Sequence, residues 1–297
     1  MKINLKRQLR KIPYANRIAR HFAGLHVPPG HYYSPIISKE DLSRRKDQIW
    51  KKHPRQIPGL NLNEDRQFSL LKDLAKYYSD IPFEDHKKEG LRYYYNNTMY
   101  GYSDAVFLFC MIRNFAPKRI IEVGSGFSSA ISLDTNHLFF DDKIQCTFIE
   151  PNPERLKSLL FKEEKINLIE SIVQEVDLDL FKTLEENDIL FIDSSHITKA
   201  GSDVNFLLFD VLPNLKKGVK IHFHDIGYPF EYPQHWVIDK LRGFNENYIL
   251  RAFLMYNSNF PIIAFNTFLT EFHEAWFKEH MPMCLKHPGG SIWLEVN

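Results

Sequence analysis

The segment RIIEVGSGFSS, at residues 119–129, decides the fold of this 297-residue chain. Its apolar run ends in Glu122 and a valine, and Gly124 and Gly126 separate that run from a helical pattern. The helical pattern continues to about Asn136. Glycine adopts backbone angles closed to other residues and lets a ligand approach the main chain closely. A glycine loop between a strand and a helix therefore predicts a ligand site at the end of that strand.

On both sides of this segment, short β-rich runs alternate with helical runs. The expected strands are residues 119–126, 145–151, 167–174, 188–196, 219–226, 248–257 and 291–297. The expected helices are residues 41–53, 65–80, 103–116 with Ser103 as N-cap and Pro117 just past the end, 127–136, 153–162, 178–186, one ending near 215, 235–244 and 268–280. Strands separated by helices of this length predict a doubly wound α/β fold with a mostly parallel sheet.

The chain before residue 96 has helical and loop patterns without the alternating strands, which predicts two domains. We expect residues 1–95 to form a helical and loop-rich cap and residues 96–297 to form the ligand-binding domain. No acid precedes Glu40, so residues 1–20 form a basic arm. Such an arm can contact RNA or an anionic membrane surface, or lie on a solvated helix.

Composition limits the remaining possibilities. Lysine and arginine total 38 and aspartate and glutamate 37, for a net charge of +1, so no DNA partner is expected. The cysteines, Cys110, Cys146 and Cys284, form no C-x-x-C pair and suggest no disulfide framework or cysteine zinc site. No apolar run approaches the roughly 20 residues of a membrane-spanning helix. We therefore expect a cytoplasmic protein, and composition leaves its oligomeric state open.

Glu150 supplies a second signal for a ligand. It ends the second expected strand, where a carboxylate can accept hydrogen bonds from both ribose hydroxyls of an adenosine ligand. Nicotinamide dinucleotide sites use G-x-G-x-x-G, but the third position here is Ser129. The Tyr-x-x-x-Lys pattern also fails, because Tyr228 is followed four residues later by Tyr232. A nicotinamide-dependent oxidoreductase is therefore the weaker alternative.

The stretch IIEVGSGFSS, with FIEPNP after the second strand, resembles motifs I and II of the class I S-adenosylmethionine-dependent methyltransferases. The resemblance covers roughly residues 95–297 and implies a Rossmann-like, seven-stranded sheet with an antiparallel last strand. It also implies S-adenosylmethionine as cofactor, with Glu122 near the methionine moiety and Glu150 on the ribose. The expected cofactor-binding residues are Glu122, Gly124, Ser125, Gly126, Ser129, Glu150, Gln174, Asp193, Asn97 and Tyr100.

Three of these expected cofactor-binding residues lie outside motifs I and II. Gln174 ends the third expected strand, where the family commonly contacts adenine with an aspartate. Asn97 and Tyr100 belong to an aromatic segment before the first strand, a region that often forms a lid in methyltransferases resembling this one. Packing of a helical cap onto the sheet is the alternative role for such residues.

Acids and histidines end the fourth and fifth expected strands. The fourth ends in Asp193-Ser-Ser-His196, and the fifth ends in His224-Asp225. If these strands are neighbours, about 4.8 Å apart, all four side chains converge beside the methyl group of the cofactor.

Three interpretations of this convergence stay open. His196 or His224, with Asp225, could act as a general base without a metal, since histidine titrates near neutral pH. Asp193, His224 and Asp225 could instead hold Mg²⁺, which would lower the pKa of a substrate hydroxyl. Some small-molecule O-methyltransferases are similar but carry an acid pair where this chain has His-Asp. The third possibility is that these polar residues only satisfy strand ends.

The expected function is methyl transfer to a hydroxyl of a small molecule or glycan. Methyltransferases that act on amino groups of nucleic acid bases carry an Asn/Asp-Pro-Pro-aromatic turn after the fourth strand, and this chain has Asp-Ser-Ser-His there. A hydroxyl acceptor needs help with deprotonation, which the acids and histidines could supply. A non-catalytic nucleotide- or RNA-binding protein that uses the basic arm is the other alternative.

Overall fold

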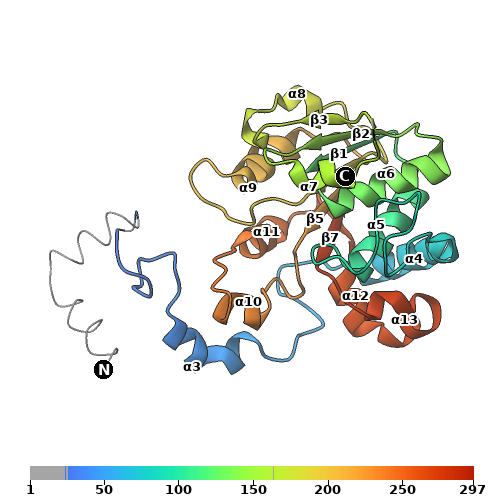
Figure 1. The fold of residues 1–297 in the computed structure, drawn as a ribbon. Coiled ribbons are helices and arrows are strands. Elements are labelled where there is room, and N and C mark those ends of the chain that lie inside the picture. Colours follow the sequence, from blue (N-terminus) through green and yellow to red (C-terminus); the bar gives the residue numbers. More distant parts are fainter. Residues whose placement is uncertain (1–23, 25, 163) are drawn as a thin grey trace, which may run out of the picture. The chain divides into compact units, whose positions relative to one another are not determined.

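The computed structural model describes residue 24, residues 26–162 and residues 164–297 (Figure 1). The chain divides into two compact units, one containing the chain up to Lys52 with Pro233–Gly243 and one containing His53–Tyr232 with Phe244–Asn297. Residues 53–95 therefore belong to the larger unit, although we expected them in a separate cap. Leu71 and Leu74 are fully buried in the core of that unit. The predicted basic arm lies outside the described residues.

A seven-stranded sheet forms the centre of the larger unit, in the order β3-β2-β1-β4-β5-β7-β6 (Figure 1). The first five strands run parallel, and β7 is antiparallel to both β5 and β6. The strands are β1 (Arg119–Val123), β2 (Gln145–Ile149), β3 (Asn167–Ile169), β4 (Ile189–Ile192), β5 (Lys220–His224), β6 (Ile262–Phe265) and β7 (Ser291–Glu295). The predicted doubly wound fold with an antiparallel last strand is confirmed.

Helices surround this sheet and precede it. The larger unit contains α4 (Glu64–Leu74), η1 (Ala75–Asp80), α5 (Tyr102–Phe115), α6 (Phe127–Phe140), α7 (Glu154–Leu159), η2 (Val173–Glu175), α8 (Leu178–Phe181), α9 (Asp203–Phe206), η3 (Leu207–Val211), η4 (Leu212–Asn214), α11 (Glu246–Leu254), α12 (Asn266–Phe272), α13 (Glu274–His280) and η5 (Pro282–Leu285). The smaller unit contains α3 (Lys39–Ile49) and α10 (Gln234–Ile238). Among all described helices, not one combines the length and the apolar character needed to cross a bilayer.

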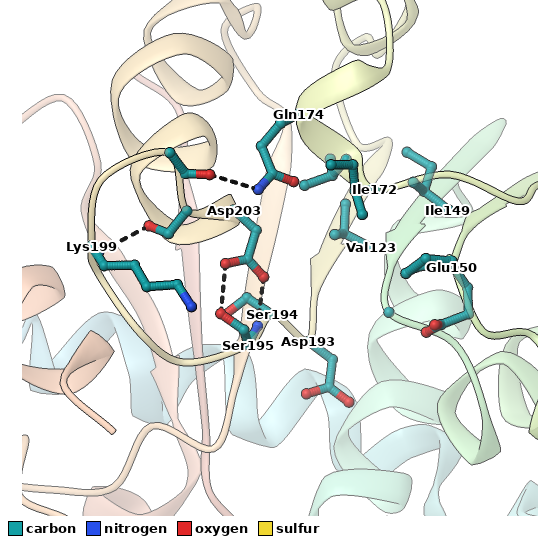
Figure 2. Close-up of a pocket in the computed structure, with 15 residues that line it drawn as sticks. Val123, Ile149, Glu150, Ile172, Gln174, Asp193, Ser194, Ser195, Lys199 and Asp203 are labelled. Atoms are coloured by element: carbon teal, nitrogen blue, oxygen red, sulfur yellow. Dashed lines mark hydrogen bonds between the residues drawn. The ribbon is translucent and has the colours of Figure 1, made fainter. Parts of the chain in front are cut away.

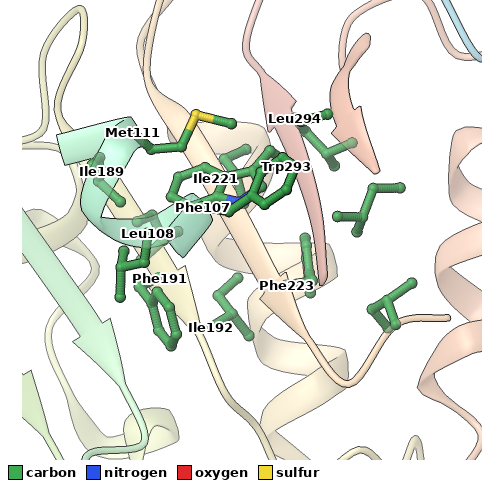
Figure 3. Packing of buried hydrophobic residues seen from close by; sticks show 14 of the residues in the cluster. Phe107, Leu108, Met111, Ile189, Phe191, Ile192, Ile221, Phe223, Trp293 and Leu294 are labelled. Atoms are coloured by element: carbon green, nitrogen blue, oxygen red, sulfur yellow. The ribbon is translucent and has the colours of Figure 1, made fainter. Parts of the chain in front are cut away.

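The centre of the sheet is packed on both faces. Every residue of β4 and β5 is buried, as parallel strands covered by helices require. Figure 3 shows Phe107, Leu108 and Met111 of α5 beside Ile189 and Trp293 of the sheet. A buried apolar side chain of this size contributes about 1.5–3 kcal/mol. This packing fixes the carboxyl ends of β4 and β5, where the predicted site lies. The helix α5 begins after Gly101 rather than at the predicted cap.

The predicted strand at 248–257 is wrong, because this segment forms α11. Leu250 and Leu254 are buried and lie four residues apart, which places them on one helical face. Leucine and arginine also favour helix, so the apolar content alone was ambiguous. The strand next to β7 is instead β6, four buried residues that follow Pro261.

The third predicted strand is shorter than expected. Strand β3 ends at Ile169 and pairs only with β2, at the edge of the sheet. Gln174 therefore lies in the short helix η2 rather than at the end of a strand.

A buried charge network fastens the aromatic segment before α5 to the sheet domain. The guanidinium of Arg92 lies 2.6 Å from Asp134 Oδ1 and 2.6 Å from Glu164 Oε1. Asp134 Oδ2 also accepts hydrogen bonds from the backbone N–H groups of Arg92 and Tyr93, both at 2.9 Å. Because Asp134 belongs to α6, the helix after the glycine loop, this network ties the segment to the site.

We expect Asp134→Ala to lower the free energy of unfolding by about 3–5 kcal/mol, because it leaves the buried Arg92 charge without this partner. Urea denaturation followed by circular dichroism would measure the change. The matched control is Asp73→Ala, whose ion pair with Lys76 is exposed, so this variant should change stability by at most about 1 kcal/mol. Equal midpoints for wild type and Asp134→Ala would contradict this account.

Candidate active site

The glycine loop is held against the end of β4 by a backbone contact. Gly124 has a φ of +80°, and its N–H donates to Ile149 O at 3.0 Å. A Cβ atom at this position would lie 2.1 Å from the carbonyl oxygen of Asp193. Glycine is therefore required for two reasons, its left-handed backbone and the closeness of the neighbouring chain. The contact places the predicted residues Gly124 and Asp193 side by side.

Glu122 is a buried carboxyl below this loop. Its Oε1 accepts hydrogen bonds from Ser128 Oγ at 2.6 Å and Ser129 Oγ at 2.9 Å. Its Oε2 is buried and has no hydrogen-bond partner among the described residues. Burial raises the pKa of Glu122 from the usual 4.5 to about 8, although the two serine hydrogen bonds oppose this shift. Glu122 is therefore largely protonated at neutral pH and has one oxygen left for a ligand.

Ser129 has a supporting role rather than the predicted cofactor contact. It is fully buried, and its hydroxyl also accepts a hydrogen bond from Gly126 N at 2.9 Å. The serine thus links the glycine loop to Glu122. Ser125 differs, because its buried hydroxyl has no partner within the described chain.

Glu150 is fixed at the end of β2 by two backbone donors. Its Oε2 accepts from Ser125 N at 3.1 Å, and its Oε1 accepts from Asn152 N at 2.8 Å. Each carboxylate oxygen has two lone pairs, so acceptor capacity remains on both. Glu150 is therefore oriented by the glycine loop and can still accept hydrogen bonds from a ligand.

A cavity of about 390 Å³ opens beside these residues. Figure 2 shows Glu150, Gln174 and Asp193 around it, from the loops after β2, β3 and β4. Gln174 lines the cavity as predicted, and its Nε2 donates to Gly201 O at 2.9 Å. The lining residues are Val123, Gly124, Ile149, Glu150, Pro151, Ile172, Val173, Gln174, Asp193, Ser194, Ser195, Lys199, Gly201, Ser202 and Asp203.

Most of these lining residues were not predicted, among them Asp203, Ile172 and Lys199. Asp203 accepts hydrogen bonds from Ser195 N and Ser195 Oγ, both at 2.6 Å, and so shapes the loop after β4 (Figure 2). Ile172 keeps 43% of its surface exposed at the cavity, and Lys199 also lines it. These residues come from loops whose path the strand and helix pattern does not specify.

The predicted cluster of acids and histidines is confirmed as a spatial group, and one further carboxylate joins it. We call Asp193, His196, His224, Asp225 and Glu246 the histidine cluster. Strands β4 and β5 are neighbours in the sheet, so their carboxyl ends bring these side chains together. The imidazole of His196 lies at the centre, with Nε2 3.4 Å from Asp193 Oδ1 and 3.6 Å from Asp225 Oδ2.

Glu246 holds the other side of that imidazole. Its Oε2 lies 2.8 Å from His196 Nδ1, and its Oε1 accepts from Ser194 Oγ at 2.9 Å. The carboxyl is buried, in the first turn of α11. No sequence signal marks this residue, because the contact joins positions 50 residues apart and the segment that follows resembles a strand.

The surrounding carboxylates make His196 a cation. Burial favours the neutral imidazole, but the nearby carboxylates of Asp193 and Glu246 outweigh it and raise the pKa of His196 to about 10. An imidazolium at neutral pH cannot accept another proton. The prediction that His196 is a general base is therefore not supported, and the residue acts as a fixed positive charge.

Asp193 carries the matching negative charge. Burial opposes its ionisation, but its contact with His196 and the positive charges of His224, His196 and Arg155 outweigh burial and lower its pKa. Its side chain keeps 37% of its surface exposed and lines the cavity. Asp193 therefore joins the cavity to the histidine cluster.

His224 is the group in this cluster that retains basic capacity. It is buried, its Nε2 lies 3.6 Å from Asp225 Oδ1, and its Nδ1 has no partner among the described residues. Burial lowers its pKa, but the carboxylates of Asp225 and Asp193 outweigh burial and raise it above 6.5. The pKa of Asp225 is itself raised, mainly by burial.

The neighbouring histidine shows the opposite behaviour. His222 stacks on Phe191 at 4.1 Å between ring centroids, and burial holds its pKa well below 6.5. It is a neutral core residue that lies two positions before His224 on β5, on the same face of the sheet.

Both strand ends of the cluster have left-handed backbone. His196 has a φ of +60° and Asp225 has a φ of +56°. This conformation costs free energy for residues other than glycine, although aspartate and histidine adopt it more readily than most. These turns bring the side chains of His196 and Asp225 toward each other.

The predicted metal site is not supported. Across the described part of the chain, no group of three or more His, Cys, Asp or Glu side chains has the arrangement of a metal centre. The imidazolium of His196 lies between the carboxylates of Asp193 and Asp225, so a positive charge already holds the place that Mg²⁺ would need. The proposed ligand set of Asp193, His224 and Asp225 therefore has no geometric basis.

The two predicted lid residues have different environments. Asn97 uses both ends of its side chain locally, donating to Tyr94 O and accepting from Tyr100 N at 2.7 Å in each case. It shapes its own turn, and a cofactor contact by Asn97 stays a prediction. Tyr100 is buried with its ring centroid 4.9 Å from that of His224, and its hydroxyl has no partner in the described residues. A cofactor contact by Tyr100 remains a prediction.

Comparison with known proteins adds a family context. Residues 121–226, from within β1 to the residues just after β5, match the family model described as "Methyltransferase domain". An uncharacterized protein of Archaeoglobus fulgidus is 37% identical over 166 residues, which cover 54% of this chain and 75% of that protein. The matched model includes the glycine loop, Glu150 and most of the histidine cluster.

Solved structures with a similar fold are distant in sequence. The SAH-bound methyltransferase PaMTH1 of Podospora anserina is 16% identical, covers 91% of this chain and 98% of its own, and has a TM-score of 0.41. The plantazolicin methyltransferase BpumL in complex with SAH is 14% identical, covers 80% of this chain and 99% of its own, and has a TM-score of 0.45.

We expect Glu246→Gln to lower the pKa of His196 by about one to three pH units, because the variant removes the negative charge that contacts Nδ1. Titration of the imidazole signals by NMR would measure the change. His222 provides an internal control, since it should remain neutral near pH 7 in both proteins. Glu295→Gln removes a carboxylate outside the site and should leave His196 unchanged. A wild-type His196 that titrates near 6.5 would contradict this description of the cluster.

Proposed function

Because the chain belongs to the class I S-adenosylmethionine-dependent methyltransferase family, we propose that it binds S-adenosylmethionine and methylates a hydroxyl group of a small molecule or glycan. The observation that carries the proposal is the position of the histidine cluster at the end of the glycine-loop cavity. Asp193 belongs to both, so an acceptor bound at the cluster lies next to a cofactor bound in the cavity.

The residues of the cavity fit this cofactor. Its volume of about 390 Å³ lies within the range of small-molecule sites. Glu150 has acceptor capacity for ribose hydroxyls, and exposed Ile172 offers an apolar surface to a base. Below Gly124, the unpartnered Glu122 Oε2 and Ser125 Oγ supply polar groups for the rest of the ligand.

When bound, the cofactor supplies an electrophilic methyl group on a sulfonium ion. The protein then has to hold the acceptor oxygen in line with that methyl group and exclude water, since positioning supplies most of the rate in such a transfer. Rigid packing of β4 and β5 supports this positioning, because both strands are buried throughout. Preorganised side chains on rigid elements keep catalytic geometry within narrow limits.

In this proposal His224 accepts the proton of the acceptor hydroxyl. Its unpartnered Nδ1 and its raised pKa make the neutral imidazole a competent base. Asp225, 3.6 Å from Nε2, stabilises the imidazolium that forms. The proton thus moves to a group whose charge is already compensated.

His196 acts on the acceptor oxygen electrostatically. Its Nε2 is 3.4 Å and 3.6 Å from the two nearest carboxylate oxygens, distances longer than the usual 2.7–3.2 Å of N–H···O hydrogen bonds. The N–H is therefore available to an oxygen that develops negative charge. A preorganised donor of this kind typically contributes about 10²–10³ in rate. This fixed cation replaces the role that a metal would have, so we expect turnover to persist in EDTA.

Cofactor binding tests the first half of the proposal. We expect S-adenosylhomocysteine to bind the wild-type protein at micromolar concentration in calorimetric titration, and Glu150→Ala to weaken binding about tenfold or more, because the ribose loses two charge-assisted hydrogen bonds. Glu154→Ala, an exposed neighbour on α7, is the matched control. Absence of binding, or binding of NAD instead, would contradict the proposal.

The pH dependence of turnover tests the second half. We expect methyl transfer to fall on the acidic side as His224 becomes protonated, with a limb above pH 6.5. Asp225→Asn removes a negative charge that raises the pKa of His224, so the limb should move to lower pH. Asparagine tolerates the left-handed backbone at this position. Transfer of a labelled methyl group to phenols, catechols and sugars between pH 5 and 10 would measure this. An unchanged limb would reject His224 as the base.

A further inference from the structure

Arg155 is a charged residue beside the glycine loop, and its guanidinium has no polar partner among the described residues. It is the second residue of α7 and is exposed. Its side chain makes no hydrogen bond or ion pair with any part of the chain that the structure describes. Arg92, Arg113 and Arg119 differ, because each forms an ion pair with an aspartate.

The side chain of Arg155 extends across the glycine loop. A Cβ atom on Gly126 would lie 3.1 Å from Arg155 Cδ and 3.8 Å from Arg155 Nη1. The absence of a side chain at position 126 therefore leaves room for the aliphatic part of Arg155 against the loop. This packing places the guanidinium beside the backbone between Gly124 and Ser128, at the start of α6.

A carboxylate of opposite charge lies on the other side of the same loop. Asp193 Cβ is 3.3 Å from the position of a Cβ atom on Gly124, and its side chain is partly exposed to the cavity. The positive charge of Arg155 is close enough to stabilise this carboxylate, although the two groups form no ion pair within 4.0 Å. An anionic group and a cationic group thus flank the loop with a gap between them.

This pair of charges matches the amino-acid end of a nucleoside ligand. An α-amino acid carries an ammonium and a carboxylate on one carbon, and arginine binds carboxylates through two parallel hydrogen bonds. In the proposed binding mode, Glu150 would hold the ribose between Gln174 and the glycine loop, and the far end of the ligand would then extend toward Asp193 and Arg155. In this arrangement Asp193 can contact the ammonium and Arg155 can contact the carboxylate.

We propose that Arg155 binds the α-carboxylate of the amino-acid end of the cofactor, opposite Asp193. The inference rests on the proposed function and adds a residue that determines cofactor specificity. It implies that the protein discriminates against adenosyl thioethers that lack the carboxylate. Arg155 is a binding residue in this assignment and takes no part in proton transfer.

Titration with a matched pair of ligands tests the assignment. S-adenosylhomocysteine and its decarboxylated form differ only in the carboxylate. We expect Arg155→Gln to weaken binding of S-adenosylhomocysteine about tenfold or more, as loss of a charged hydrogen bond does, and to leave binding of the decarboxylated form within about twofold. Arg155→Lys keeps the charge without the paired geometry and should fall between wild type and Arg155→Gln.

Controls separate this role from a structural one. Lys157→Gln removes an exposed cation from the same helix and should bind both ligands as wild type does. An equal loss of affinity for both ligands in Arg155→Gln, or no loss for either, would overturn the assignment. Failure of wild type to bind S-adenosylhomocysteine would overturn the proposed function as well, whereas normal wild-type binding with an unaffected Arg155→Gln would overturn only this inference.

Discussion

The site depends on one backbone contact, the approach of Gly124 to the carbonyl of Asp193. Any Cβ atom at position 124 would lie 2.1 Å from that oxygen, so the loop after β1 and the end of β4 can meet only at a glycine. The contact does more than shape a turn. It sets the carboxylate that ends β4 at the mouth of the cavity and makes cofactor site and histidine cluster continuous.

Charge balance organises the second half of the site. Three carboxylates surround His196, and without that imidazolium they would repel one another in a poorly solvated volume. The positive charge of His196 reduces this repulsion. Its Nε2 lies 3.4 Å and 3.6 Å from the oxygens of Asp193 and Asp225, so the N–H makes no short hydrogen bond with either. Burial and the positive charge of His196 lower the pKa of His224, whereas the carboxylates of Asp225 and Asp193 raise it. The charges of the histidine cluster therefore affect both acceptor binding and proton transfer in the proposed reaction.

Local pattern was sufficient for the parts of the fold that have strong local signals. The strands around Glu122, Glu150 and Asp193 are apolar runs that stop at a glycine or an acid, and each could be predicted. The segment of α11 could not, because Leu250 and Leu254 reveal their helical spacing only once their buried face is known. Glu246 was missed for the same reason, since its contact with His196 spans 50 residues and depends on where α11 packs.

The left-handed residues at the ends of β4 and β5 have a consequence for variation among relatives. Positions 196 and 225 both have φ values near +60°, which disfavour β-branched side chains and favour glycine, asparagine, aspartate and histidine. Three of these four residue types also carry polar groups suited to proton transfer or hydrogen bonding. Backbone conformation thus restricts these two positions to a few residue types, independently of the chemistry of the site. Substitutions tolerated there would therefore exchange one polar side chain for another more often than they would remove polar groups from the site.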